Sequence, residues 1–170
     1  MNRVCIIGCP GAGKSTLSFK IAEKTGLPLY HLDQMFWRPG WVEADRDSFR
    51  QQHAQIITDE RWIIDGMYRT TFADRLAAAD TVIFLDYPRW RCLYGVLKRL
   101  WKTRGRVRAD MADGCPEKLD WDFLVYVWRF FPAHKPMILD ILEKGSSGKS
   151  VLKFDTPRAL RGWMVKEGLA

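Results

Sequence analysis

Long apolar runs, internal repeats and zinc-binding cysteine patterns are all missing from this 170-residue sequence. A membrane-spanning helix needs about 20 consecutive apolar residues, and no segment approaches that length, so we expect no membrane partner. The cysteines are scattered and do not have the spacing of zinc ligands: Cys5, Cys9, Cys92 and Cys115. These features predict one cytoplasmic domain with reduced thiols and no structural zinc.

Acidic residues are also missing from one long stretch of the chain, between Asp86 and Asp110. Eight positively charged residues lie in that stretch: Arg89, Arg91, Lys98, Arg99, Lys102, Arg104, Arg106 and Arg108. The formal net charge of the whole chain is +7, so the remainder is almost neutral. This concentration of charge predicts a local site for a polyanion rather than a generally basic surface.

The motif that is present lies near the start of the chain. Residues 8–15 read G-C-P-G-A-G-K-S and fill every fixed position of the phosphate-binding pattern G-x-x-x-x-G-K-[ST]. An apolar run at 4–7 precedes the motif and a helix is expected over 14–25. A glycine-rich turn that only caps a helix is the competing interpretation, and the flanking strand and helix argue against it.

This context predicts a site for the β- and γ-phosphates of ATP. Glycines let the backbone N–H groups surround the phosphates, Lys14 supplies a charge, and the Ser15 hydroxyl can join the Mg²⁺ shell. The expected ATP-binding residues are Gly8, Pro10, Gly11, Ala12, Gly13, Lys14, Ser15 and Thr16.

Strand-like and helix-like segments alternate along the rest of the chain. Further strands are expected at 29–32, 62–64, 81–85 and 150–154, and further helices near 45–58, 72–79, 88–104, from Pro116, 136–144 and 157–166. This alternation predicts an α/β protein with a five-stranded parallel sheet covered by helices on both faces, and together with the motif at 8–15 it predicts the P-loop nucleoside triphosphate hydrolase fold. We expect one domain over 1–170, with an acceptor-binding insertion at 34–60 and a lid region at 99–132.

Three aspartates each follow a predicted strand: Asp33, Asp65 and Asp86. The carboxyl ends of parallel strands meet at the ligand-binding edge of such a sheet, so all three are expected beside the phosphate loop. Asp65 is the first choice for ordering Mg²⁺, and Asp33 is best placed to orient or deprotonate an acceptor hydroxyl. An aspartate after a strand is also a common helix cap or turn former, and that interpretation stays open for Asp86 in particular.

Two segments carry a resemblance to a known family. Residues 62–70 (WIIDGMYRT) resemble the strand-D-G-F-P-R-T segment of adenylate kinases, and residues 81–88 (TVIFLDYP) are similar to their next strand. The resemblance implies a metal-site role for Asp65 and an acceptor-phosphate contact for Arg69. Where that family has Phe-Pro, this chain has Met67 and Tyr68.

The chain is closer still to bacterial proteins related to adenylate kinase, the DNA topology modulation proteins. The resembling features are the phosphate loop, His31-Leu32-Asp33, residues 37–41 (WRPGW), residues 62–68, residues 108–111 (RADM) and residues 114–117 (GCPE). This resemblance spans most of the chain and implies an adenylate-kinase-like fold with a helical lid and a kinase-like site.

The basic segment 98–108 falls where related kinases have a lid that closes over the triphosphate. Arginines brought to the transferring phosphoryl group stabilise its developing charge, and lid closure expels water. Arg99 and Arg104 are the best candidates for this catalytic and ATP-binding role, followed by Arg106 and Arg108. A solvated basic helix face is the competing interpretation.

Aromatic residues and arginines surround the predicted acceptor region. Phe36, Trp37 and Trp41 could stack on an acceptor base or sugar, and most of the eight tryptophans are expected to serve packing. The expected acceptor-binding residues are Asp33, Arg38, Trp41, Asp65, Tyr68 and Arg69. His31 is expected to be packed or hydrogen-bonded rather than a catalytic base. Arg158, after the last strand, could stack on adenine, and a capped helix start explains the same sequence equally well.

These observations favour an ATP- and Mg²⁺-dependent kinase for a small acceptor. Arg69 and the aromatic loop favour a nucleotide or nucleoside as acceptor, and a sugar or another metabolite stays open. The competing functions are a DNA-binding or regulatory ATPase that affects DNA topology, with nucleic acid as partner of the basic helix, and a nucleotide-binding switch.

Overall fold

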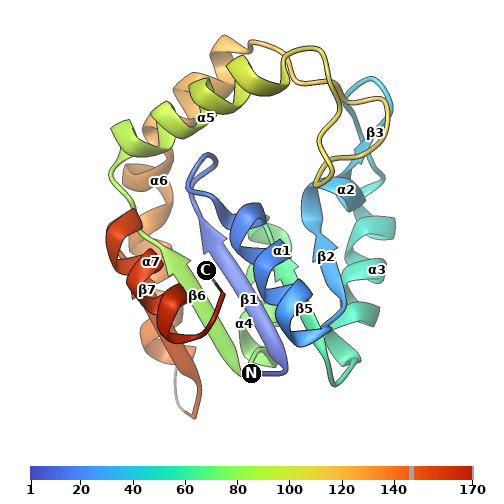
Figure 1. Ribbon diagram of the computed structural model, residues 1–170. Helices are drawn as coiled ribbons and strands as arrows, with labels where there is room; N and C mark the ends of the chain where they lie inside the picture. Colours follow the sequence, from blue (N-terminus) through green and yellow to red (C-terminus); the bar gives the residue numbers. More distant parts are fainter. Residues whose placement is uncertain (146–147, 170) are drawn as a thin grey trace.

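The computed structural model describes residues 1–145 and 148–169. Its centre is a parallel sheet of five strands in the order β2-β5-β1-β6-β7 (Figure 1). The strands are β1 (Arg3–Gly8), β2 (Leu29–His31), β5 (Trp62–Asp65), β6 (Thr81–Leu85) and β7 (Ser150–Phe154). Every residue of β5 and β6 is buried, which is typical of parallel strands covered on both faces.

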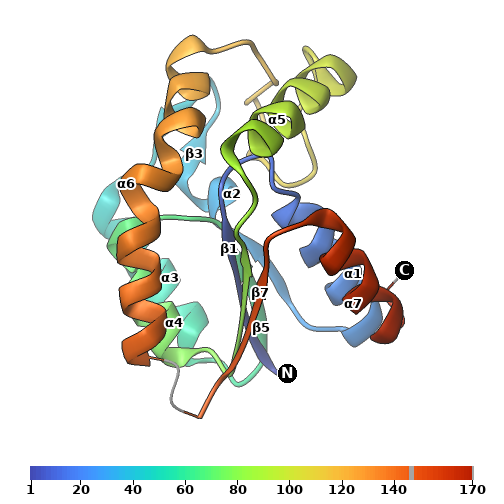
Figure 2. The same ribbon diagram turned by 90° about the vertical axis from the view of Figure 1, so that its left-hand side faces the viewer.

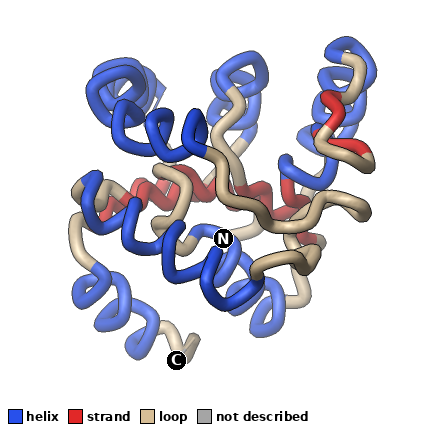
Figure 3. The backbone as a smooth tube through the Cα atoms, turned by 90° about the horizontal axis from the view of Figure 1, so that it is seen from above, coloured by secondary structure: helices blue, strands red, loops and turns tan. Residues whose placement is uncertain are grey.

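Helices cover both faces of the sheet, as Figures 2 and 3 show. One face carries α1 (Lys14–Thr25) and α7 (Pro157–Lys166), and the other carries α3 (Arg46–Thr58), α4 (Phe72–Ala78) and α6 (Trp121–Gly145). Helix α5 (Arg89–Thr103) lies beyond the carboxyl ends of the strands and packs against α6. The core forms because apolar strand residues are enclosed between these two helix layers.

Two smaller features lie at the carboxyl ends of the strands. Helix α2 (Leu32–Phe36) leads into a hairpin of β3 (Trp37–Arg38) and β4 (Val42–Glu43), and a 3₁₀ turn, η1 (Arg69–Thr71), follows β5. Residues 104–120, which we call the strap, connect α5 to α6 and pass over this hairpin (Figure 1).

The structure corrects the prediction of two helices in the region 116–144. Pro116 does not start a helix, and residues 121–145 form one continuous helix that contains Pro132 and Pro136. Val127, Phe130 and Ile138 on this helix are fully buried against the sheet. The burial of this face outweighs the hydrogen bonds that the two prolines cannot make, so tertiary packing overrides the local signal.

A second difference concerns the strand before Asp33. Strand β2 ends at His31, and Asp33 lies in the first turn of α2 rather than directly behind a strand. No helix in the described residues is both long enough and apolar enough to cross a membrane.

Candidate functional site

The phosphate loop joins the end of β1 to the start of α1, as the sequence predicts. Gly11 and Gly13 have φ angles of +79° and +95°, which a residue with a side chain adopts only under strain. No side chain caps the N-terminus of α1, so its first N–H groups are free to bind an anion. The Lys14 ammonium donates a hydrogen bond to the Cys9 carbonyl oxygen (3.2 Å), which holds it beside the loop.

Helix α5 packs directly on the phosphate loop through two glycines. A Cβ atom at Gly95 would lie 2.1 Å from the Gly11 carbonyl oxygen, and one at Gly11 would lie 2.2 Å from the Cys92 carbonyl oxygen. No side chain fits at either position. This close approach fixes the middle of α5, just before the lid region, against the loop that is predicted to hold the triphosphate.

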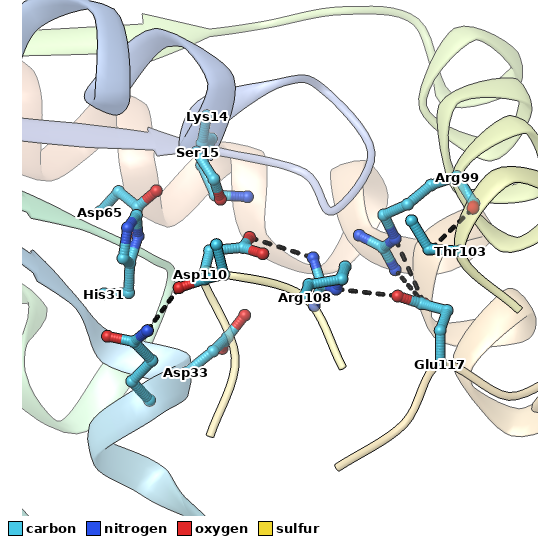
Figure 4. Close-up of polar contacts among 12 residues, drawn as sticks. Lys14, Ser15, His31, Asp33, Asp65, Arg99, Thr103, Arg108, Asp110 and Glu117 are labelled. Carbon is cyan, nitrogen blue, oxygen red and sulfur yellow. Dashed lines mark hydrogen bonds and ion pairs between the residues drawn. The ribbon is translucent and has the colours of Figure 1, made fainter. Parts of the chain in front are cut away.

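Asp65 lies buried at the end of β5 and is held by two neighbours. Its Oδ1 is 2.8 Å from Nδ1 of His31, and its Oδ2 accepts a hydrogen bond from Ser18 (3.1 Å). Burial lowers the pKa of His31, but the Asp65, Asp110 and Asp33 carboxylates outweigh it, so that this pKa is raised overall. His31 is therefore hydrogen-bonded and buried, and the pair sits beside Lys14 and Ser15 in Figure 4.

Asp33 faces the same space from α2 (Figure 4). Its Oδ1 accepts a hydrogen bond from the Tyr68 hydroxyl (2.8 Å), and the Tyr68 ring packs against Phe36 and Phe49. Burial raises the pKa of the Asp33 carboxyl, although the Tyr68 hydroxyl and the Lys14 charge oppose the shift. A carboxylate with a raised pKa, fixed by a neighbouring hydroxyl, is suited to accepting a proton.

The strap carries an ion-pair chain toward this site. Nη2 of Arg99 is 2.9 Å from Oε1 of Glu117, Nε of Arg108 is 2.8 Å from Oε2 of Glu117, and Nη1 of Arg108 is 3.0 Å from Oδ2 of Asp110. The carboxylates of Glu117 and Asp110 are buried. In Figure 4 Asp110 lies between Arg108 and the Lys14–Ser15 pair, so the chain connects α5 to the phosphate loop.

Hydrogen bonds also fasten the strap to the segment around the β3–β4 hairpin. Each involves a main-chain oxygen: Gln34 Nε2 to Ala109 (2.6 Å), Gly40 N to Gly114 (2.9 Å), Cys115 Sγ to Arg38 (3.1 Å) and Trp41 Nε1 to Pro116 (3.2 Å). The two covering segments therefore meet each other above the sheet edge rather than lying open.

The structure brings together many of the predicted site residues and leaves others aside. Lys14, Ser15, Asp33, Asp65 and Arg99 come together around one space (Figure 4). Exposed positions are occupied by Arg38, Arg69, Arg104 and Arg158. The Thr156 side chain caps α7 by accepting from the Ala159 N–H, and this supports the helix-cap interpretation of the segment around Arg158.

Asp86 takes a different role from the other strand-end aspartates. Its Oδ2 lies 2.8 Å from Nζ of Lys135 and 2.9 Å from Nζ of Lys153. These two ion pairs tie the end of β6 to α6 and β7, which agrees with the structural interpretation of this residue.

Three further residues of the site were not assigned a role from the sequence. Asp110 and Glu117 occupy the two anionic positions of the ion-pair chain, and Arg75 is fully buried in α4. Arg75 donates to the carbonyl oxygens of Gly66 (3.0 Å) and Tyr68 (3.3 Å), so it positions the turn that presents Tyr68 to Asp33. The only sequence signal for Asp110 and Glu117 is that acidic residues return directly after the basic segment 98–108.

The site contains hydroxyl and carboxylate oxygens, which suit Mg²⁺ as ligands. Ser15 lies in the first turn of α1, and the Asp65 carboxylate lies behind it. Asp110 is also close: burial raises the pKa of its carboxyl, but Arg108 and the Ser15 hydroxyl lower it overall. Hydroxyl and carboxylate oxygens are the ligands that Mg²⁺ prefers. Among the described residues, no group of three or more histidines, cysteines or acids forms a cluster that could hold a metal by itself.

The chain as a whole is similar to known P-loop kinases. No family model matches the chain. It is similar to the adenylate kinases of two Mycobacterium leprae strains, Br4923 and TN, with 29% identity in an alignment that covers 65% of this chain and 74% of each relative. Among solved structures, the shikimate kinase of Acinetobacter baumannii in complex with shikimate matches with a TM-score of 0.59 and 14% identity, over 99% of this chain and 93% of that one. The predicted α/β fold of the P-loop nucleoside triphosphate hydrolases is thereby confirmed.

Proposed function

We propose that the protein is a P-loop kinase that transfers the γ-phosphoryl group of ATP to a hydroxyl of a small acceptor, a nucleotide or nucleoside. The observation that carries this proposal is the meeting of three parts at one sheet edge: the phosphate loop, the Asp33 carboxylate and the arginines of the lid region. The similarity to adenylate kinases supports a P-loop kinase and leaves the acceptor open. Membership of the DNA topology modulation group remains a prediction.

In this proposal the phosphate loop holds the triphosphate. The backbone N–H groups of residues 8–16 and the Lys14 ammonium bind the β- and γ-phosphates. Ser15 and Asp65 would hold Mg²⁺, whose charge would neutralise the phosphate oxygens. Asp65 is in turn oriented by His31 and Ser18, which fixes the side of its carboxylate that faces the loop. Arg158 remains a candidate for contact with the base.

Asp33 is proposed to act on the acceptor. Its carboxylate is held by Tyr68, and its raised pKa suits a group that accepts the hydroxyl proton as transfer proceeds. If the accepting group beside Asp33 were a phosphate, its negative charge would be repelled by Asp33 and Asp65. A hydroxyl therefore suits this position better than a phosphate. Arg38, Trp41, Tyr68 and Arg69 are proposed to bind the remainder of the acceptor, with residues 34–60 as the acceptor-binding insertion.

The lid region, residues 99–132, is proposed to close the site and to supply positive charge. Arg99 and Arg108 are the arginines that face it, through the ion pairs with Glu117 and Asp110. The exposed Arg104 at the end of α5 would reach the phosphates only after the strap rearranges. Positioned guanidinium groups stabilise the charge of the transferring phosphoryl group without further reorganisation.

The test is a screen of nucleosides, nucleoside monophosphates and sugars for a phosphorylated product that depends on ATP. For the best acceptor, Asp33→Asn should lower the transfer rate by about 10²–10⁴-fold, the usual contribution of a general base, while ATP binding is kept. Asp140→Asn, at an exposed position of α6 outside both the acceptor-binding insertion and the lid region, is the matched control and should be neutral.

Three results would count against this function. If Asp33→Asn transfers as fast as the unchanged protein, Asp33 is not the base. If ATP is bound but no acceptor yields a product, the nucleotide-binding switch gains support. If ATP is hydrolysed and the protein binds DNA with an affinity that falls steeply with salt, the regulatory ATPase is the better description.

A further inference from the structure

Helix α5 exposes a continuous apolar stripe that the fold does not use. Its members are Trp90 (64% exposed), Tyr94 (54%), Leu97 (43%) and Trp101 (84%). The spacings of four, three and four residues place all four on one side of the helix, over a length of about 16 Å. The buried side of α5 is a different one, with Cys92 and Val96 facing the core and Gly95 facing the phosphate loop.

The apolar surface extends past the start of the stripe into a groove. This groove has a volume of about 790 Å³ and lies between the start of α5 and the middle of α6. Trp90 belongs to both the stripe and the groove, and Phe131, Pro132 and Leu139 of α6 continue the apolar wall. Large aromatic residues exposed together in this way mark an interaction surface rather than chance exposure.

The charges that α5 itself carries beside the stripe are all positive, and the acid that lines the groove, Asp86, is paired with Lys135 and Lys153. Lys98 and Lys102 are exposed and point to one flank of it, since they follow Tyr94 and Leu97 by four and five residues. In the described part of the chain neither lysine forms an ion pair. No acidic residue occurs between Asp86 and Asp110, so the surface that complements this face is anionic.

Two other occupants fit less well than a lipid surface. A second copy of the same face would bring its lysines against each other with no acid from the stripe to separate them. Single-stranded nucleic acid needs free ring faces for base stacking. The Arg91 guanidinium already lies over Tyr94 (5.3 Å to the ring centre), which leaves the stripe only Trp90 and Trp101, about 16 Å apart along the helix, for stacking.

We propose that α5 binds the surface of a bilayer containing anionic lipids. Its Trp-Tyr-Leu-Trp stripe would enter the boundary between headgroups and acyl chains, and the adjoining lysines would contact the anionic headgroups. An exposed helix with aromatic residues on one side and lysines beside them has the properties of an interfacial helix. This inference does not depend on the proposed kinase activity, and it revises the expectation of no membrane partner, which rested on the absence of a spanning segment.

The test is sedimentation of the full-length protein with vesicles. Vesicles of phosphatidylglycerol and phosphatidylcholine should bind it, vesicles of phosphatidylcholine alone should bind it weakly, and added salt should release it. Lys98→Glu with Lys102→Glu should weaken binding by roughly 30-fold, since each surface lysine contributes about a factor of five. Leu97→Ser with Trp101→Ser should weaken it by about tenfold or more because the inserted apolar area is lost.

Control variants on α7 separate the stripe from general surface effects. Val165→Ser and Lys166→Glu make the same chemical changes at exposed positions of another helix and should leave vesicle binding unchanged. All variants change exposed side chains, and circular dichroism checks that each is folded.

Several outcomes would overturn the inference. One is failure of the unchanged protein to sediment with anionic vesicles, and another is equal binding by the stripe variants. A dimer in solution that the stripe variants dissociate would assign the face to a second copy instead. Binding of a single-stranded oligonucleotide without vesicle binding would assign it to nucleic acid.

Discussion

The phosphate loop and the strap cover the same site from opposite sides, but they are held in place in different ways. The loop is fixed by backbone conformation and by the contact of Gly11 with Gly95, where no atom can be added. The strap is fixed by ion pairs of Glu117 and by hydrogen bonds to the segment around the β3–β4 hairpin. The first arrangement has one stable geometry, whereas the second is made of contacts that can be exchanged.

This difference suits the proposed division of labour. A site for phosphate needs N–H groups that are already oriented, because reorientation during transfer would cost free energy. A lid must open to admit ATP and release product, so contacts that individually contribute little are appropriate. The guanidinium groups of Arg99 and Arg108 are paired with carboxylates that the phosphates of ATP could replace.

The largest effect is expected from a change at the loop. Gly95→Ala would place a methyl group 2.1 Å from the Gly11 carbonyl oxygen, so α5 and the phosphate loop must separate. A shift of this size at a reacting centre costs about 10²-fold in rate. Steady-state kinetics with the identified acceptor and calorimetric ATP binding measure it.

Gly162→Ala is the matched control for this substitution. Gly162 lies within helix α7, and no atom is within 4 Å of the added methyl group. The control should be stabilised by about 0.5–1 kcal/mol with unchanged activity. Normal ATP binding and activity in Gly95→Ala would show that the contact with α5 does not hold the phosphate loop in one geometry.

An intermediate effect is expected from the strap. Glu117→Gln removes the charge that joins Arg99 to Arg108, so the strap should open more often and trypsin should cleave after residues 104–108 faster. A double-mutant cycle with Arg99→Gln should give a coupling free energy of about 1 kcal/mol, because both partners are largely buried.

The exposed pair of Arg46 and Glu43, at 3.8 Å, provides the control for the strap. Its coupling free energy should be about 0.5 kcal/mol or less, as for other surface pairs. Equal coupling in the two cycles, with unchanged cleavage, would mean that the ion-pair chain does not hold the strap.

The smallest effect is expected on the free energy of unfolding as pH changes, through two buried histidines, one in α3 and one at the sheet edge. Burial, with Arg75 next, lowers the pKa of His53 in the covering helix α3 to about 4. The unfolded state therefore binds a proton that the folded state does not, and the free energy of unfolding should fall as pH decreases below about 6.5. Between pH 7 and 5.5 the loss is about 1 kcal/mol.

His31 at the sheet edge should act in the opposite direction. Its folded-state pKa is raised, so its contribution is complete below about 6.5 and is lost as pH rises through the folded-state value. Stability should therefore be greatest near pH 6.5, by urea unfolding at several pH values. His53→Asn should remove the acid-side decline and His31→Asn the alkaline-side decline; the reverse assignment would contradict these environments.

Much of the fold was predictable because its signals are local. The sequence shows the apolar runs at β1, β5 and β6, the aspartates at the ends of β5 and β6, the motif of the phosphate loop and the start of α3 near Asp45. The region 116–144 was predicted wrongly, because two prolines outweighed the apolar face that packs α6 onto the sheet. The direction of a helix face toward a distant sheet is not a local property.

The features of the site likewise fall into those with a local sequence signal and those that depend on tertiary contacts. The amino-acid sequence by itself determined the phosphate loop, because the geometry of this loop depends on glycines and a lysine that are neighbours in sequence. Only the tertiary structure decided that Asp65 is held by His31, that Tyr68 binds Asp33, and that Glu117 joins Arg99 to Arg108. These partners are 9 to 35 residues apart along the chain, and only the packing of the sheet, α5 and the strap brings their charges within hydrogen-bonding distance.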